Sequence, residues 1–166
     1  MGFMRPIRSL ARAAGVVVLL ALSPASARAD ATAFIGSNTT PSRRPVTGFA
    51  VGLGLLIVAF EFEYATTTDD VATLAPALKT GMGNVLLQPP FAIFRLQPYF
   101  TTGGGMYRET LGSHQETGVG TNVGGGVKVS LAGPLRLRVD YRVMKLGRDA
   151  LNSPAHRVYA GVNLSF

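Results

Sequence analysis

Five side chains in the sequence have the types that hydrolytic chemistry needs. They are Ser113, His114, Glu116, Ser153 and His156. A serine nucleophile needs a base within hydrogen-bonding reach and a third group that orients the base. Ser113 and His114 are neighbours in the sequence, so on a strand their side chains face opposite ways. His156 stands at the start of the last extended segment, where a solvated histidine is expected. We therefore predict no catalytic residues and no enzyme.

Patterns for a metal or nucleotide site are absent from the sequence. The chain has no cysteine, which excludes thiolate ligands and disulfides, and two isolated histidines do not make a metal site. No phosphate-binding G-x-x-x-x-G-K-S/T motif occurs, and the glycine triplets at 103–105 and 124–126 lack the strand–helix context of a dinucleotide fingerprint. We expect no metal and no cofactor, and we interpret the triplets as places where a sheet bends or strands pack closely.

Charged residues follow a period of two in segment 135–144. An apolar set alternates there with a set that is nearly all charged: Leu135, Leu137, Val139, Tyr141 and Val143 against Arg136, Arg138, Asp140, Arg142 and Met144. Period two is the signature of a β-strand whose faces meet different environments. The same alternation sets Glu61 and Glu63 against Phe62 and Tyr64. A helix would place these glutamates on its apolar face, so we predict a strand there too.

The last ten residues repeat the alternation. One set is apolar and ends on an aromatic residue: Val158, Ala160, Val162, Leu164 and Phe166. The residues between them are Arg157, Tyr159, Gly161, Asn163 and Ser165. About ten residues is the length that a tilted strand needs to cross a bilayer. This segment therefore predicts a membrane-crossing strand.

The first 29 residues have the features of a secretory signal peptide. Basic residues precede a short apolar run at 13–22, and an A-x-A site follows it. We predict cleavage after Ala29, which leaves one domain at 30–166. Of the 16 basic residues four precede Asp30, so 12 remain against 9 acidic residues and the net charge is +3. This excess is too small to indicate nucleic-acid binding.

The remaining chain divides into eight extended segments. We predict strands at 31–38, two within 47–67 with a turn near 53–56, and others at 78–88, 94–108, 117–131, 135–144 and 157–166. Long polar connections at 39–46, 66–77, 109–116 and 145–154 alternate with short ones near 54, near 90 and at 132–134. No substantial helix is expected, because glycines interrupt the apolar run 46–60, which is also shorter than a membrane helix.

Two architectures produce eight alternating strands, and they differ in which face is apolar. A soluble lipocalin-like barrel buries apolar residues, whereas a membrane barrel turns them outward. Connections that alternate long and short favour the membrane barrel, with short turns in the periplasm. Aromatic residues on the apolar set also favour it, because they would form lipid-facing girdles: Phe62, Tyr64, Phe94, Phe100, Tyr141 and Phe166. We predict an all-β, eight-stranded, antiparallel up-and-down transmembrane β-barrel.

A membrane barrel turns the charged set into its interior. The inward candidates are Glu61, Glu63, Arg95, Lys128, Arg136, Arg138, Asp140, Arg142 and Arg157. Unpaired buried charge costs several kcal/mol, so the three acids must pair with arginines. The positive surplus would need water or an anion. An eight-stranded barrel is just wide enough for side chains to fill it, so an open pore is disfavoured.

The second half of the chain contains three motifs: Pro98-Tyr99 followed by 103–105, the stretch 124–127 leading into 138–142, and the ending 161–166. These motifs resemble those of the eight-stranded OmpA/OmpX-type outer-membrane barrels of Gram-negative bacteria. The resemblance implies an outer-membrane location. It also implies that Val162, Leu164 and Phe166 form the signal that the barrel-assembly machinery recognises. The first half of the chain matches by pattern alone.

These motifs are architectural and imply no activity. We expect a monomer with a structural or surface-interaction role, in contact with outer-membrane lipid and lipopolysaccharide. Arg43, Arg44 and Arg148 lie in predicted loops and are candidates for contact with lipopolysaccharide phosphates. Two alternatives remain open: an outer-membrane enzyme that modifies lipid A, as some barrels of this size do, and a soluble periplasmic lipocalin-like carrier.

Overall fold

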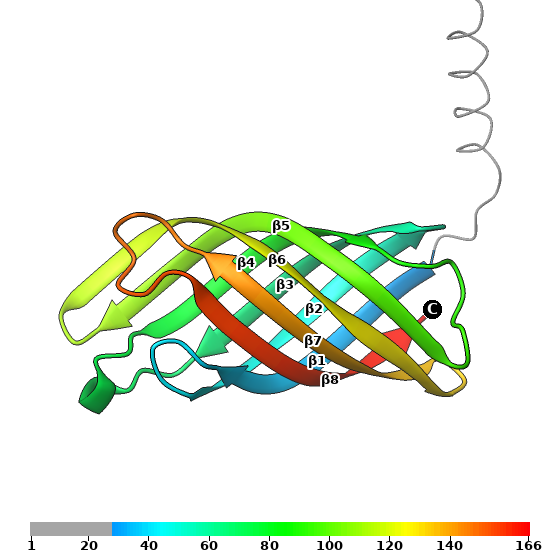
Figure 1. Ribbon diagram of the computed structural model, residues 1–166, viewed down its shortest axis with the longest axis horizontal. Helices are drawn as coiled ribbons and strands as arrows, with labels where there is room; N and C mark the ends of the chain where they lie inside the picture. Colours follow the sequence, from blue (N-terminus) through cyan, green and yellow to red (C-terminus); the bar gives the residue numbers. More distant parts are fainter. Residues whose placement is uncertain (1–27) are drawn as a thin grey trace, which may run out of the picture.

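The computed structural model describes residues 28–166, which form eight strands and one short 3-10 helix (Figure 1). The strands are β1 (Arg28–Asn38), β2 (Arg44–Leu55), β3 (Val58–Thr67), β4 (Ala77–Leu87), β5 (Leu96–Leu111), β6 (His114–Ala132), β7 (Leu135–Lys145) and β8 (Ala155–Ser165). The helix η1 spans Val71–Thr73. The predicted signal peptide at 1–29 lies outside the described residues except for its last two positions, with which β1 begins.

The strands form a closed antiparallel barrel in the order in which they occur in the chain. Every strand pairs with its sequence neighbour, and β1 closes the barrel against β8, with Ala33 opposite Val162. The prediction of an eight-stranded up-and-down barrel is therefore confirmed. Among the described residues, no helix is long and apolar enough to cross a membrane.

The connections gather at two ends of the barrel. Four of them, at 39–43, 68–76, 112–113 and 146–154, lie at one end, which we call the loop end (Figure 1). The connections 56–57, 88–95 and 133–134 lie with Arg28 and Phe166 at the other, which we call the terminal end.

One predicted polar loop is instead part of a long hairpin. Residues 109–116 were expected to be a loop, but β5 and β6 stay paired as far as Leu111 and His114. Gly112 makes the turn with φ +58°, a conformation that glycine adopts without steric cost. Polarity misled the prediction because strands that extend beyond a membrane are polar on both faces.

The two faces of the wall have opposite character. Large apolar side chains cover the outside, and the six aromatic residues predicted to face outward are all exposed. Buried side chains inside include Glu61, Glu63, Arg138, Asp140 and Arg142. The apolar face is therefore outside, which is the reverse of a soluble carrier barrel. Such a polarity is that of a transmembrane barrel.

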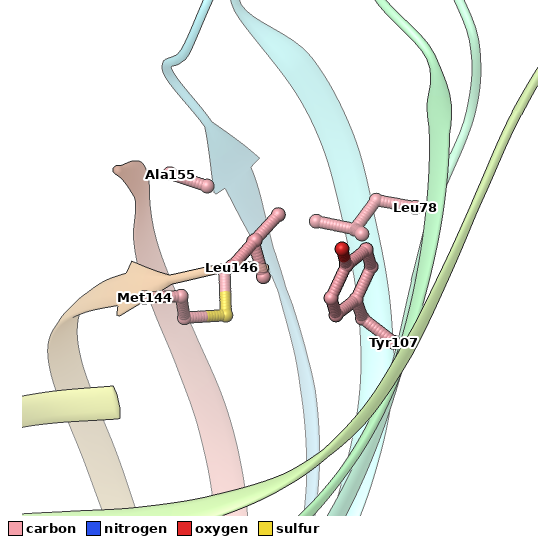
Figure 2. Packing of buried hydrophobic residues seen from close by; sticks show 5 residues of the cluster. All are labelled: Leu78, Tyr107, Met144, Leu146 and Ala155. Atoms are coloured by element: carbon pink, nitrogen blue, oxygen red, sulfur yellow. The ribbon is translucent and has the colours of Figure 1, made fainter. Parts of the chain in front are cut away.

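Small clusters of buried apolar residues lie on both sides of the charged centre. Near the loop end, Leu78, Tyr107, Met144, Leu146 and Ala155 pack together, with Leu146 in the middle of the group (Figure 2). We call this group the apolar plug. Its members come from four strands and from the connection after β7, so the plug ties that connection to the barrel wall.

An aromatic stack fills the interior beside the seam between β1 and β8. Phe34 of β1 points inward and stacks on Tyr159 of β8, with ring centroids 4.0 Å apart. A Cβ on Gly48 would lie 2.4 Å from the Phe34 ring, and a Cβ on Gly36 would lie 2.6 Å from the Tyr159 Cβ. Glycine at position 48 therefore leaves room for the Phe34 ring, and glycine at position 36 allows the backbone of β8 to approach closely.

Candidate functional site: the charged interior and the loop end

The charged centre of the barrel is built by strands that face each other across the lumen. Glu61 and Glu63 come from β3, whereas Arg138, Asp140 and Arg142 come from β7, four strands away in a ring of eight. On both strands the period of two turns alternate residues inward. These five side chains were predicted to face the interior, and the structure brings them together.

Glu61 is the acceptor for two arginines. Arg138 holds both of its carboxylate oxygens, with 3.2 Å between Nη2 and Oε1 and a second, shorter contact from Nη1 to Oε2. Arg142 Nη2 lies 2.9 Å from Oε1. The bidentate contact uses the planar fork of the guanidinium, which matches a carboxylate in geometry.

Asp140 pairs with the same two arginines from within β7. Its oxygens lie 3.1 Å from Arg138 Nη2 and 3.0 Å from Arg142 Nε. The Tyr99 hydroxyl donates to Asp140 Oδ2 and accepts a 2.7 Å hydrogen bond from Arg138 Nε. Tyr99, which comes from β5, therefore links the acid and the base of one strand.

Glu63 extends the cluster toward the loop end. Its carboxylate lies 3.1 Å from Arg142 Nη2 and 3.2 Å from Arg157 Nη1. The Tyr159 hydroxyl donates to Glu63 Oε2 at 3.0 Å. Arg157, which is fully buried, also donates to Asn38 Oδ1 and Thr80 Oγ1, each at 3.2 Å. The cluster is thus continuous from Glu61 to Arg157.

A separate ion pair lies nearer the terminal end. Lys128 is 1% exposed, and its Nζ lies 2.5 Å from Asp30 Oδ2. Asp30 was not predicted as an interior residue, because we placed it at the cleavage site rather than in a strand. Its period-two relation to Thr32 and Phe34, both buried, could have revealed it.

The ion-paired residues are balanced in charge. Four acids, Asp30, Glu61, Glu63 and Asp140, meet four bases, Lys128, Arg138, Arg142 and Arg157. We expected three acids against six bases and a surplus of positive charge. The difference has two sources: Asp30 joins the set, and two of the predicted bases lie elsewhere.

Arg95 and Arg136 are the two bases outside the ion-paired set. Arg95 lies exposed in the connection before β5, where its φ of +70° breaks the alternation from which we placed it inside. Its guanidinium donates to the backbone carbonyls of Ser130, at 2.9 Å, and Leu131. Arg136 is half-buried near the terminal end and donates to Gln97 Oε1 at 3.1 Å.

Inward glycines of β6 make room for the large side chains of the cluster. A Cβ on Gly124 would lie 2.9 Å from Arg142 Cγ, and one on Gly126 would lie 2.5 Å from the Tyr99 hydroxyl oxygen. The triplet 124–126 therefore marks the place where bulky neighbours cross the lumen. At both positions the atom nearest to an added Cβ is a backbone carbonyl oxygen of β7, at 2.2 Å, which agrees with the predicted close packing between strands.

The three loop arginines occupy different environments. Arg43 and Arg148 are exposed, in the connections after β1 and after β7. Arg44 is 4% exposed, and its guanidinium donates inward to the carbonyls of Pro76, Thr68 and Thr40, the last two at 3.3 and 2.9 Å. The expectation that Arg44 is free for surface contacts is wrong, because β2 begins there and turns this side chain into the barrel.

The candidate catalytic residues do not converge. The Tyr141 hydroxyl and His156 Nδ1 lie 2.7 Å apart on the outer surface. Ser153 Oγ accepts from the Leu146 backbone N–H at 3.1 Å. No hydrogen bond joins a serine to a histidine among residues 28–166, and that part of the chain holds no group of three potential metal ligands.

The residues of the predicted assembly signal line the outside of β8. Val162, Leu164 and Phe166 are 52%, 39% and 72% exposed, on the same face of the strand. The Phe166 backbone N–H donates to the Ala29 carbonyl at 2.8 Å, which continues the β1–β8 seam. Their orientation is compatible with recognition of this strand, by the barrel-assembly machinery, from its lipid-facing side.

Comparison with known proteins gave matches of structure only. No family model and no curated protein sequence matches the chain. The N-terminal β-barrel domain of Pseudomonas aeruginosa OprF is similar with a TM-score of 0.66 and 14% identity, over 84% of this chain and 97% of that one.

Two further solved barrels are similar over the same 84% of this chain. Neisserial surface protein A (NspA) has a TM-score of 0.63 and 18% identity and is covered over 96% of its length. The attachment invasion locus protein Ail of Yersinia pestis has a TM-score of 0.53 and 10% identity and is covered over 98%. The chain therefore has the fold of the small eight-stranded outer-membrane β-barrels of the OmpA/OmpX type.

Proposed function

We propose that this chain is a non-catalytic barrel of the Gram-negative outer membrane, with a structural or surface-interaction role. The observation that carries the proposal is the filled interior. Side chains of β3, β7 and β8 meet across the lumen in ion pairs, and the apolar plug lies between them and the loop end. Such an interior favours a structural role in the membrane over a role as a pore for solutes.

The proposed orientation follows from the two ends of the barrel. In outer-membrane barrels the periplasmic turns are short and the extracellular loops longer. We therefore assign the terminal end to the periplasm and the loop end to the cell surface. A signal peptide that is then cleaved would direct the chain to export, and the barrel-assembly machinery would insert it into the membrane.

Fractionation and electrophoresis test the location and the fold together. We expect an outer-membrane band whose mobility in detergent changes on boiling, because closed hydrogen-bonded barrels resist detergent until they are heated. A protein that stays soluble in the periplasm without detergent would contradict the proposal.

Conductance separates a filled barrel from a pore. The purified barrel in a planar bilayer should give no stable current steps. Regular single-channel openings that disappear when the protein is omitted would overturn the view of a closed interior.

Because Arg44 is buried, Arg43 and Arg148 remain as the candidates for contact with lipopolysaccharide. Arg43 and Arg148 present their charges at the loop end, where phosphates of neighbouring lipopolysaccharide would lie. Substituting both with glutamine should raise the permeability of the outer membrane to a dye that intact cells exclude. Unchanged permeability at equal protein level would remove this role.

A further inference from the structure

A row of polar outward side chains crosses five strands near the loop end. Thr47, Thr66, Lys79, Arg108 and Thr117 stand directly opposite one another in turn on β2 to β6. All lie on the outside of the wall, and Lys79 and Arg108 are exposed. We call this set the basic row. It presents two cations flanked by three hydroxyl groups on neighbouring strands.

The two cations are placed against each other without a carboxylate between them. Like charges directly opposite on a sheet destabilise it, since their Cβ atoms are only about 4.5–5.5 Å apart. Within residues 28–166 neither Lys79 nor Arg108 forms an ion pair. Arg108 Nε donates to Thr117 Oγ1 at 3.2 Å, which leaves its terminal nitrogens free to bind an anion. An anion in front of the pair would remove the repulsion.

The next outward row toward the terminal end is apolar. It consists of Phe49, Tyr64, Gly81, Met106 and Val119, again opposite one another on β2 to β6. The Phe49 and Tyr64 rings lie 5.8 Å apart. The two aromatic residues mark the boundary between the headgroups and the acyl chains of a bilayer on β2 and β3. Lys79 stands opposite Thr66, two residues beyond Tyr64 toward the loop end, and is therefore placed at headgroup depth.

A shallow slot runs from this boundary along β4. Gly81 and Gly83 face outward, and an added Cβ would meet no atom closer than 4.0 Å at Gly81 and 3.8 Å at Gly83. Phe62 stands opposite Gly83 on the neighbouring strand. Gly83 also lines an apolar groove of about 700 Å³ with Phe60, Phe62 and Val85. Because Gly81 and Gly83 have no side chains, the wall leaves space here against which an acyl chain can lie.

We propose that the basic row binds the phosphate of a lipid A molecule, one acyl chain of which lies over Gly81 and Gly83. Lysine supplies a point charge, arginine two parallel N–H donors, and the threonines hydroxyl donors, a set that suits a phosphate monoester. The phosphate and the apolar slot lie in the order in which headgroup and chain follow each other in the outer leaflet. The proposal rests on the orientation given under Proposed function.

Binding by the purified full barrel in detergent tests the ligand class. The probes are diphosphorylated lipid A, lipid A without phosphates, phosphatidylglycerol and inorganic phosphate, each titrated and followed by native mass spectrometry. We expect a saturable one-to-one complex with phosphorylated lipid A alone. Equal binding of dephosphorylated lipid A, of phosphatidylglycerol or of inorganic phosphate would overturn the assignment.

A charge reversal within the row tests the residues. Lys79→Glu should weaken lipid A binding roughly tenfold to a hundredfold, the effect of losing a charge-assisted hydrogen bond. It should also raise the thermal midpoint in detergent, because glutamate would pair with Arg108. The matched control is Lys145→Glu, at an exposed position opposite Thr121 on β6. Equal loss of binding in both variants would overturn the site in favour of general charge attraction.

Filling the slot tests the acyl chain independently. Gly83→Leu has room on the outside and should lower affinity for lipid A while the heat-dependent gel shift is retained. Ala160→Leu adds a comparable side chain to the exposed face of β8 and should leave binding unchanged. If Gly83→Leu bound lipid A with unaltered affinity, the proposal that an acyl chain lies in the slot would be overturned. These measurements use purified protein, so failed binding is distinct from a failure of the proposed location, which fractionation alone decides.

Discussion

Arg138 of β7 donates hydrogen bonds to both carboxylate oxygens of Glu61, which lies on β3 in the opposite wall of the barrel. The two residues are 77 positions apart in the chain, and both side chains are at most 2% exposed. A bidentate pair across the lumen fixes the separation of the two walls. It also leaves no wide passage at this level, because Arg142 reaches the same carboxylate beside it.

Removing the acid of this pair should weaken the barrel. Glu61→Gln leaves Arg138 and Arg142 buried with one carboxylate fewer, and breaking a buried pair costs about 3–5 kcal/mol. We expect the midpoint of urea unfolding in detergent to fall accordingly. The chain has no tryptophan, so the loss of the heat-dependent gel shift is the practical readout.

A second glutamate provides the control for that experiment. Glu116 is half-buried on β6 near the hairpin turn, and it belongs to none of the ion pairs of residues 28–166. Glu116→Gln removes the same charge and should change the midpoint little. Equal midpoints for the two variants would show that the charged centre does not contribute to stability.

Alternation in the sequence was enough to predict the charged centre. Glu61, Glu63, Arg138 and Asp140 each occupy an inward position because the neighbouring residues on their strands are apolar and outward. No rule based on one strand could tell which acid meets which base. That pairing depends on the register across several strands and on the stagger of the closed barrel, neither of which is encoded locally.

Predictions failed where the chain leaves the regular strand. Phe94 and Arg95 have φ values of +50° and +70°, which non-glycine residues seldom adopt, so the alternation of β5 does not extend back to Arg95. Arg44 differs from its prediction for another reason. The sequence predicts a polar loop at 39–46, whereas β2 begins at Arg44 and the guanidinium donates to the carbonyls of Thr40 and Pro76.

Two adjacent glycines should respond differently to the same substitution. A Cβ on Gly103 would lie 2.2 Å from the Gly83 carbonyl and 2.3 Å from Asn84 Oδ1, whereas one on Gly104 would approach nothing closer than 3.4 Å. Gly103→Ala should therefore destabilise the barrel by about 1–3 kcal/mol, the usual cost of overpacking. Gly104→Ala serves as the control and should be close to neutral in the same urea series. A Gly103→Ala barrel as stable as the parent would mean that the wall is free to relax at this point.

Arg43 and Arg44 are neighbours at the loop end, but only Arg44 is expected to restrain the connection between β3 and β4. Arg44→Ala removes donors from three backbone carbonyls, among them those of Thr68 and Pro76, which flank the connection that contains η1. We expect faster proteolysis between 68 and 76 in the folded barrel, because backbone groups that lose their partners open more readily. Arg43→Ala, at an exposed side chain, should leave the cleavage rate unchanged. Similar rates in both variants would show that Arg44 does not restrain this connection.

The C-terminal residue is expected to act in assembly rather than in stability. Phe166 is 72% exposed on the lipid side of the seam, and its backbone N–H already bonds to Ala29, so its side chain adds little to the packing of the barrel. If the side chain serves as an assembly signal, Phe166→Ala should lower the amount of heat-shifting barrel in the outer membrane several-fold. The purified variant should nevertheless refold in detergent and unfold in urea at the parent midpoint. Phe94→Ala removes an equally large exposed ring from the same end of the barrel and should assemble normally. Loss of refolding in detergent would instead assign Phe166 a structural role in closing β1 against β8.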